Sequence, residues 1–152
     1  METFALWLTG LPGSGKSTIA NTLYEELGEI DINLDILRMD AMREYVTPEP
    51  SYSDEERQLI YNAFAFSAKL LMDHHVCVIM DATGNLRKYR ALARQILDPY
   101  FEIYLKCPLD IAINRERKRS ETYDAPSNVY KQAKTGETKT IPGLQVPYEP
   151  PE

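Results

Sequence analysis

A phosphate-binding loop near the start of the chain limits its fold more than any other feature. Residues 10–18 read GLPGSGKST, which contains the full pattern of a glycine, four further residues, and then Gly-Lys-Ser. The apolar residues 4–8 before the loop are typical of a strand, and residues 19–27 after it have the spacing of an amphipathic helix. A glycine-rich turn without function would not need a strand, a loop and a helix in this order. The pattern therefore predicts an α/β fold that binds a nucleotide.

The residues of this loop have distinct expected roles in binding Mg·ATP. Glycines let consecutive backbone N–H groups turn towards one phosphate, and the positive end of the following helix points at the same anion. Lys16 would reach the β- and γ-phosphates, and Ser17 would ligate Mg²⁺. The other loop residues expected to contact ATP are Gly10, Pro12, Gly13, Ser14, Gly15 and Thr18.

Length and composition restrict the classes of partner. The 152 residues suit one domain spanning residues 1–152, and the net charge of −6 argues against long nucleic acid as a ligand. No apolar run approaches the roughly 18 residues of a membrane span, and no basic signal sequence precedes the loop, so the cytoplasm is the expected compartment. Cys77 and Cys107 lie in apolar segments without metal-ligand spacing, so both are expected to be buried and reduced.

Strands and helices are expected to alternate along the chain. Further strands are predicted at residues 30–34, 76–80 and 101–105. Helices are predicted at residues 40–45, 53–73, 85–97, 109–118 and 126–134. In the long helix, Leu59, Ala63, Phe66 and Leu70 share one face, and Phe64 and Phe66 are expected in the core. This order predicts a three-layer α/β/α P-loop kinase fold with a mostly parallel sheet, whose ligands bind at the carboxyl ends of the strands.

An acidic and a basic residue follow the second predicted strand. Asp40 and Arg43 are three residues apart, which places them on one face of a helical turn. A carboxylate near the γ-phosphate can accept a proton from an attacking hydroxyl, and an arginine can hold an anionic substrate. The alternative is a surface ion pair of little energetic value. Their position after a strand favours a role in the site.

Two further places carry charged residues of interest. Asp81 closes the apolar run 76–80, which is the form of a Walker B element that holds Mg²⁺; the alternative is an N-cap for the next segment. The basic segment 115–119 begins a region, residues 115–128, that would act as a lid. From it, Arg115 would neutralise charge on the γ-phosphate and Arg119 would contact the nucleotide, whereas a solvated helix end is the plain alternative. The Asn-Lys-x-Asp tetrad of GTPases is absent, which favours a small-molecule kinase.

The chain resembles the adenylylsulfate kinase family over nearly its whole length. The resemblance is carried by FALWLTGLPGSGKSTIA at 4–20, FEIYL with Pro-Leu in 101–109, VYKQAKTGE at 129–137 and PYEPP at 147–151, within a tail of residues 138–152. It implies ATP- and Mg²⁺-dependent phosphorylation of the 3′-hydroxyl of adenosine 5′-phosphosulfate (APS), a nucleotide substrate. Members of the family are often dimers, so the resemblance allows a homodimer.

The resemblance also implies roles for single residues. Asp40 matches the catalytic base, and Arg43 and Arg57 match arginines that hold the substrate. Tyr52 stands where the family has a phenylalanine that stacks on the substrate adenine, and Lys131 matches a lysine near the substrate.

Other positions depart from the family pattern. Arg38-Met39 replaces Asp-Gly before the base, Ile60 stands in a helix motif that lacks the substrate-binding asparagine, and Ile141 replaces a second adenine-stacking phenylalanine. The segment 82–85, which includes the expected substrate residue Thr83, replaces Phe-Ile-Ser-Pro. With Asp81 it is similar to the strand end of polynucleotide-kinase-like enzymes, the alternative family, whose acceptors are polynucleotides, nucleosides or small hydroxyl compounds. A nucleotide-binding regulator without catalysis is a third alternative, which the joint presence of Lys16, Ser17, Asp40 and Arg43 disfavours.

Overall fold

The fold is an α/β sandwich, seen in the computed structural model, which describes residues 2–122 and 148–152. The first half contains β1 (Ala5–Thr9), α1 (Lys16–Glu29), β2 (Leu34–Arg38), α2 (Met39–Val46) and α3 (Asp54–Asp73). The second half contains β3 (Cys77–Asp81), α4 (Arg87–Ile96), β4 (Tyr100–Tyr104) and α5 (Leu109–Thr122).

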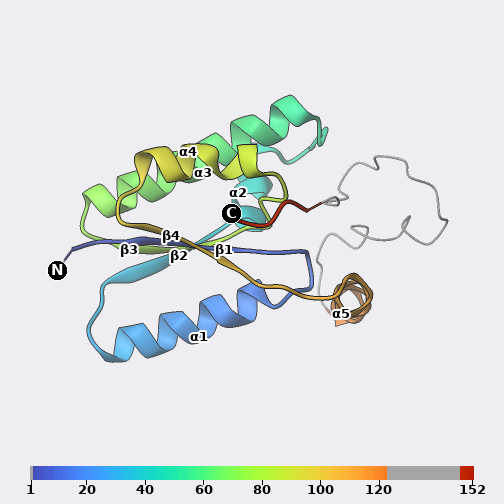
Figure 1. Cartoon of the computed structure of the whole chain (residues 1–152), viewed down its shortest axis with the longest axis horizontal. Helices are drawn as coiled ribbons and strands as arrows, with labels where there is room; N and C mark the ends of the chain where they lie inside the picture. Colours follow the sequence, from blue (N-terminus) through green and yellow to red (C-terminus); the bar gives the residue numbers. More distant parts are fainter. Residues whose placement is uncertain (1, 123–147) are drawn as a thin grey trace.

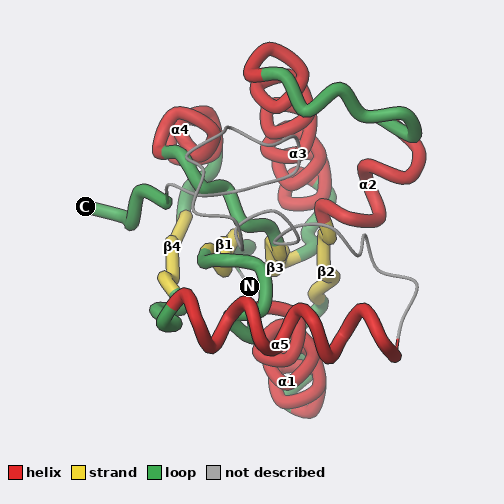
Figure 2. Tube along the Cα trace, turned by 90° about the vertical axis from the view of Figure 1, so that its right-hand side faces the viewer, coloured by secondary structure: helices red, strands yellow, loops and turns green. Residues whose placement is uncertain are grey.

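The described strands form one parallel sheet in the order β2-β3-β1-β4. Helices α2, α3 and α4 lie on one face of the sheet, and α1 lies on the other with α5 near the carboxyl edge (Figures 1 and 2). This arrangement confirms the predicted three-layer fold. Among the described residues, no helix is long and apolar enough to cross a membrane.

Strand alternation divides the core into two clusters. On the α3–α4 side, Trp7 and Met80 pack with Tyr61, Phe64 and other residues of those helices. On the α1 side, Leu8 and Ile79 pack against Ala20. Successive strand residues thus point to opposite faces, and both faces are covered by helices, as expected for a parallel sheet.

Three expectations about these elements were wrong. The second strand comprises residues 34–38 instead of 30–34, because α1 continues to Glu29 and residues 30–32 form the turn that follows. Phe66 is 56% exposed, and Leu59 and Leu70 are exposed with it, because the opposite face of α3 covers the sheet. Cys107 is only half-buried, since it lies in the loop between β4 and α5.

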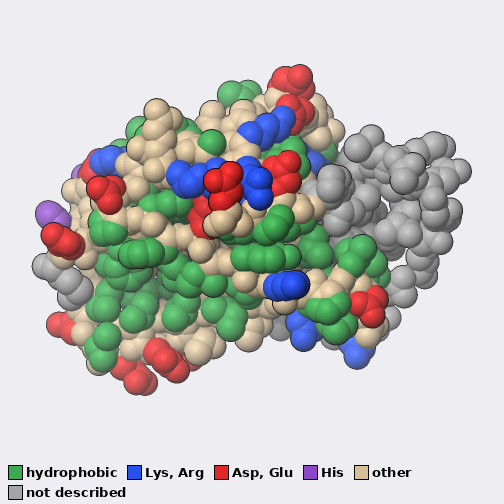
Figure 3. Space-filling view, viewed as in Figure 1, with side chains coloured by type: hydrophobic (Ala, Val, Ile, Leu, Met, Phe, Trp, Pro, Cys, Tyr) green, Lys and Arg blue, Asp and Glu red, His purple; other side chains and the backbone are tan. Residues whose placement is uncertain are grey.

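β4 is an edge strand with exposed apolar side chains. Its residues Phe101 and Ile103 pair with Leu6 and Leu8 of β1, which places them on the α1 side of the sheet. They are 55% and 45% exposed. Figure 3 shows apolar side chains gathered on this part of the surface. We call Phe101 and Ile103 the β4 apolar face.

Candidate functional site

The carboxyl ends of three strands meet beside the phosphate loop. Leu8 pairs with Asp81, and Arg38 pairs with Asp81 on the other side of β3. β1 runs directly into the loop, and β2 runs directly into α2. The predicted phosphate, metal and acceptor residues on these segments therefore share one edge of the sheet, which faces the viewer in Figure 2.

The phosphate loop adopts a backbone that requires glycine at two points. Gly13 and Gly15 have φ angles of 83° and 100°, in the left-handed region. A Cβ on Gly13 would also collide with the carbonyl group of Ala112 in α5, whose carbonyl carbon would lie 3.1 Å away. A Cβ on Gly15 would point into open space. The loop is thus packed against α5 on one side and open on the other.

Polar groups of the loop fit the phosphates of ATP. Lys16 is 9% exposed, and its Nζ donates to the carbonyl oxygens of Gly10 and Leu11 at 3.0 Å each. The buried Ser14 Oγ has no hydrogen-bond partner among the described residues. Gly15 caps α1 without a side-chain hydrogen bond, and the first turn contains no acidic residue. A positive helix end and an ammonium group therefore face the same loop.

Asp81 joins the phosphate loop to β2. Its Oδ2 accepts hydrogen bonds from Ser17 Oγ at 2.7 Å and from Arg38 Nη1 at 2.9 Å. A hydroxyl and a carboxylate side by side are the hard oxygen ligands that Mg²⁺ takes, usually with water and phosphate oxygens completing the shell. The described residues contain no group of three or more His, Cys, Asp or Glu that could hold a metal ion. Ser17 and Asp81 therefore fit Mg²⁺ that arrives with a nucleotide.

Arg43, Tyr52 and Arg57 come together beyond α2. The guanidinium carbons of Arg43 and Arg57 lie 5.3 and 5.8 Å from the centre of the Tyr52 ring. Asp40 is exposed at the start of α2, and no described residue forms an ion pair with it. The alternative of an Asp40–Arg43 ion pair is wrong, because Arg43 Nη1 lies 3.7 Å from Glu56 Oε1 instead.

Glu56 fastens the segment that carries Tyr52. Its carboxylate accepts hydrogen bonds from Ser51 N at 2.9 Å and Tyr52 N at 3.2 Å. The bond from the Ser51 backbone, followed by that from its hydroxyl, holds the pKa of Glu56 below its ordinary value. Tyr52 has a φ of 56°, which is uncommon for a residue with a side chain and is maintained by these contacts.

The C-terminal residues return to the same edge of the sheet, which the sequence did not indicate. Tyr148 stacks on Tyr104 at 5.0 Å, and its hydroxyl lies 2.6 Å from Thr9 Oγ1, next to the phosphate loop. Thr9 Oγ1 also donates to the carbonyl oxygen of Thr83 at 2.5 Å. Thr83 itself is buried at the end of β3, so its carbonyl joins this network.

Buried Arg90 holds this region together, and it too was missed. Its Nη2 donates to Glu149 O at 2.7 Å, its Nη1 donates to Gly84 O, and its Nε lies 3.3 Å from Glu102 Oε2. Its place nine residues after Asp81, in the segment that is similar to polynucleotide-kinase-like enzymes, does not identify Gly84, Glu102 and Glu149 as its partners.

The predicted lid residues are only partly described. Arg115 is exposed on α5, and its Nη1 lies 3.9 Å from Cys107 Sγ. The side chain of Arg119, and Lys131 and Ile141 entirely, lie outside the described residues. Residues 123–128 of the predicted lid and 138–147 of the predicted tail lie outside them as well.

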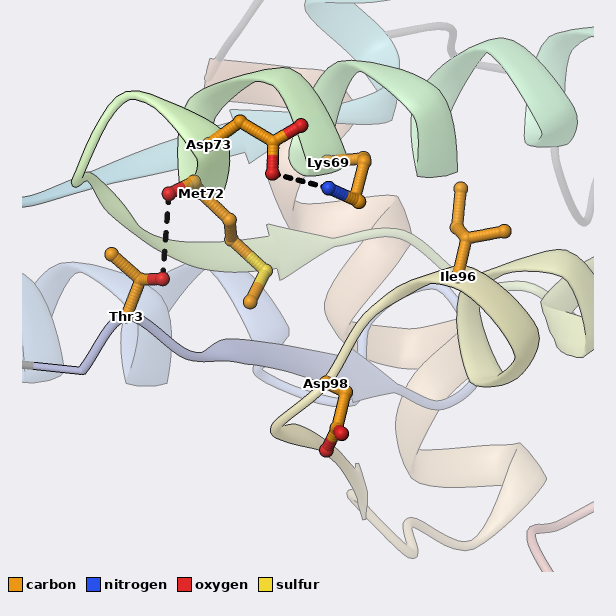
Figure 4. A pocket seen from close by; sticks show the side chains of 6 residues that line it. All are labelled: Thr3, Lys69, Met72, Asp73, Ile96 and Asp98. Atoms are coloured by element: carbon orange, nitrogen blue, oxygen red, sulfur yellow. Dashed lines mark hydrogen bonds and ion pairs between the residues drawn. The ribbon is translucent and has the colours of Figure 1, made fainter.

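A small pocket lies at the opposite end of the sheet. Figure 4 shows its lining by Thr3, Lys69, Met72, Asp73, Ile96 and Asp98, near the amino ends of the strands. Thr3 Oγ1 donates to Met72 O at 3.4 Å, and Lys69 pairs with Asp73. Because none of these residues comes from the phosphate-loop edge, this pocket is separate from the candidate site.

Known proteins are similar to this chain in sequence and in fold. Residues 2–152 match the family model described as "Adenylylsulphate kinase". The probable adenylyl-sulfate kinase of Archaeoglobus fulgidus is 31% identical over 150 residues, which cover 99% of this chain and 91% of the relative. That of Bacillus subtilis is 36% identical over 149 residues, which cover 97% and 71%. The structure of the Mycobacterium tuberculosis APS kinase CysC in complex with AMPPNP and APS matches with a TM-score of 0.80 and 29% identity, over 99% of this chain and 84% of that chain.

Proposed function

Since this chain belongs to the adenylylsulfate kinase family, we propose that it transfers the γ-phosphoryl group of ATP to the 3′-hydroxyl of APS. The products are 3′-phosphoadenosine 5′-phosphosulfate and ADP, a step of sulfate assimilation. We further propose that the reaction takes place in the cytoplasm. The observation that carries the proposal is the shared sheet edge, where the phosphate loop follows β1 and the Asp40–Arg43 helix follows β2, one on either side of β3.

The phosphate loop binds the donor. Lys16 exchanges its contacts with the Gly10 and Leu11 carbonyl oxygens for the β- and γ-phosphates, because it is already inside the loop. The remaining loop residues surround the phosphates with backbone N–H groups. Ser17 and Asp81 hold Mg²⁺, which neutralises charge on the β- and γ-phosphates when bound. We assign Arg115 the neutralisation of charge on the γ-phosphate and Arg119 a contact with the nucleotide.

Asp40 serves as the base for the acceptor. Its exposed carboxylate, free of any described ion-pair partner, accepts the proton of the 3′-hydroxyl as that oxygen forms a bond to the γ-phosphorus. The bond between the γ-phosphorus and the bridging oxygen breaks, and the electron pair leaves with ADP.

The group of Arg43, Tyr52 and Arg57 receives APS. The two guanidinium groups hold its 5′-phosphosulfate, and the Tyr52 ring stacks on its adenine. Thr83, Lys131 and Ile141 complete the acceptor side. With one aromatic ring stacking on the adenine, we expect a lower affinity for APS than two stacking rings would give.

Incubation with ATP and candidate acceptors tests the function, with products separated by anion-exchange chromatography. We expect APS to be converted to a product carrying one more phosphate, with ADP formed in equal amount. The acceptors compared are APS, a nucleoside and an oligonucleotide with a 5′-hydroxyl. Phosphorylation of the nucleoside or the oligonucleotide without turnover of APS would favour the polynucleotide-kinase-like alternative, and ATP binding without any transfer would favour a regulator.

The role of Asp40 has its own test. Asp40→Asn keeps the shape of the side chain but removes the proton acceptor, so kcat with APS should fall by about 10²–10⁴. Asp35→Asn, an exposed carboxylate on β2, is the matched control and should leave kcat unchanged. A kcat for Asp40→Asn within a few-fold of the parent would exclude Asp40 as the base.

The protein acts as a homodimer in this proposal. The β4 apolar face supports it, because exposed edge strands pair readily and apolar patches mark contact surfaces. A second copy applied to this edge would cover Phe101 and Ile103 and leave the phosphate-loop edge open.

A further inference from the structure

We propose that Arg38 competes with Mg²⁺ for Asp81 and thereby sets the Mg²⁺ concentration at which the site binds nucleotide. The guanidinium is the only described cation that pairs with this carboxylate. It donates to Oδ2, the same oxygen that accepts from Ser17.

The fold fixes Arg38 in this position. Arg38 and Asp81 are register partners at the ends of β2 and β3, so their side chains leave the sheet on the same side. Arg38 Nη2 also donates to Asn21 Oδ1 on α1, which holds the guanidinium under the strand ends. The Arg38 side chain is 33% exposed and that of Asp81 is 8% exposed, so the carboxylate is shielded from water while the arginine can move outwards.

The two cations compete at this carboxylate through charge and through the occupancy of Oδ2. A metal ligand must present a lone pair to the ion, and Oδ2 already accepts two hydrogen bonds. Mg²⁺ held directly by Oδ2 would have to replace one of these two donors, and two cations at one carboxylate oxygen repel each other. Nucleotide binding with Mg²⁺ therefore includes the cost of separating Arg38 from Asp81.

A second ion pair in the chain has similar side-chain exposures but lies outside the candidate site. Arg94 and Glu102 join α4 to β4, with side-chain exposures of 42% and 8%, close to those of Arg38 and Asp81. Their pair lies away from the phosphate loop. Arg94→Gln is therefore the control for loss of an arginine that only holds two elements together.

The experiment measures Mg²⁺ dependence of binding, without turnover. MgCl₂ is titrated into the full chain with a non-hydrolysable ATP analogue, and analogue binding is followed by calorimetry. Arg38→Gln removes the charge and keeps a hydrogen-bond donor, so the half-saturating Mg²⁺ concentration should fall about tenfold. Arg38→Lys keeps the charge, so its midpoint should lie between those of the parent and Arg38→Gln. Arg94→Gln should have the parent's midpoint.

The possible results separate this inference from the proposed function. An unchanged or higher midpoint in Arg38→Gln, with normal Mg²⁺-dependent binding in the parent, would overturn the competition alone. The competition rests on the Mg²⁺ site of the proposed function, so analogue binding that needs no Mg²⁺ in the parent would overturn that site together with the competition, whereas absence of APS turnover would overturn the proposed reaction alone. Thermal unfolding in EDTA verifies that each variant is folded. If Arg38→Gln is not folded, Arg38→Lys decides the question: a half-saturating Mg²⁺ concentration equal to or above that of the parent overturns the competition.

Discussion

Replacing Arg90 by methionine tests how the C-terminal residues are held beside the phosphate loop. The guanidinium is fully buried. It forms an ion pair with Glu102 and donates hydrogen bonds to the carbonyl oxygens of Gly84 and Glu149. Methionine has a similar length but no donor, so all three acceptors lose a partner. Removing one member of a buried ion pair costs about 3–5 kcal/mol. Glu102 retains Arg94 as a partner, which favours the lower end, about 3 kcal/mol.

A fall in the melting temperature measures this cost. For a chain of this size, each kcal/mol lowers Tm by about 2–4 °C, so Arg90→Met should melt about 6–12 °C below the parent. Arg94→Met is the matched control, because Arg94 binds the same carboxylate from a side chain that is 42% exposed. Its pair contributes at most about 1 kcal/mol, or roughly 4 °C. If the two variants melt together in scanning calorimetry, burial adds nothing to the Arg90 contacts and the reasoning is refuted.

Three further predictions concern nucleotide, pH and assembly. Lys16→Ala should lower kcat by at least about 10² while the circular dichroism spectrum stays unchanged, and an undiminished kcat would exclude Lys16 from catalysis. The pKa of Glu56 is lowered in the folded protein, so its carboxylate stabilises the fold above its ordinary pKa of 4.5, and this contribution is lost as pH falls below that value. On acidification from pH 6 to pH 3, the Tm of Glu56→Gln should therefore fall less than the Tm of the parent. Equal falls in Tm for the two proteins would contradict this. Ile103→Asp should convert a dimer to a monomer in light scattering, whereas Phe66→Ser on the exposed face of α3 should not; a monomeric parent, or a dimeric Ile103→Asp, would contradict the proposed interface.

The order of elements could be predicted because each carries a local signal. The strand–loop–helix at residues 4–27 and the Ser53 N-cap, whose hydroxyl accepts from Glu56 N at 3.1 Å, depend on neighbouring residues alone. The position of β2 could not, because residues 30–34 alternate apolar and polar more regularly than residues 34–38 do. The error hid the Arg38–Asp81 pair, which follows only from the correct register.

The long helix shows a second limit of sequence reasoning. α3 has two apolar faces, one with Tyr61, Phe64 and Met72 and one with Leu59 and Phe66. Both have helical spacing, so periodicity cannot decide which one meets the sheet. Only packing against α4 and β3 decides it. The contacts of Arg90 with Glu149 and of Tyr148 with Thr9 could not be predicted from local patterns, because they join residues that are 59 and 139 positions apart.

The two long helices begin in different ways, and the difference concerns energy as well as geometry. α3 starts with Ser53 and three acidic residues, so its own chain neutralises the positive end. α1 starts at Lys16 after the capping residue Gly15, with no side-chain cap and no acidic residue in its first turn. The first turn of α1 therefore draws its stabilisation from whatever anion is bound there. Local stability at the phosphate loop becomes a function of nucleotide concentration, growing as RT ln(1 + [L]/Kd), so the cell's ATP level contributes to the folding of the site that consumes it.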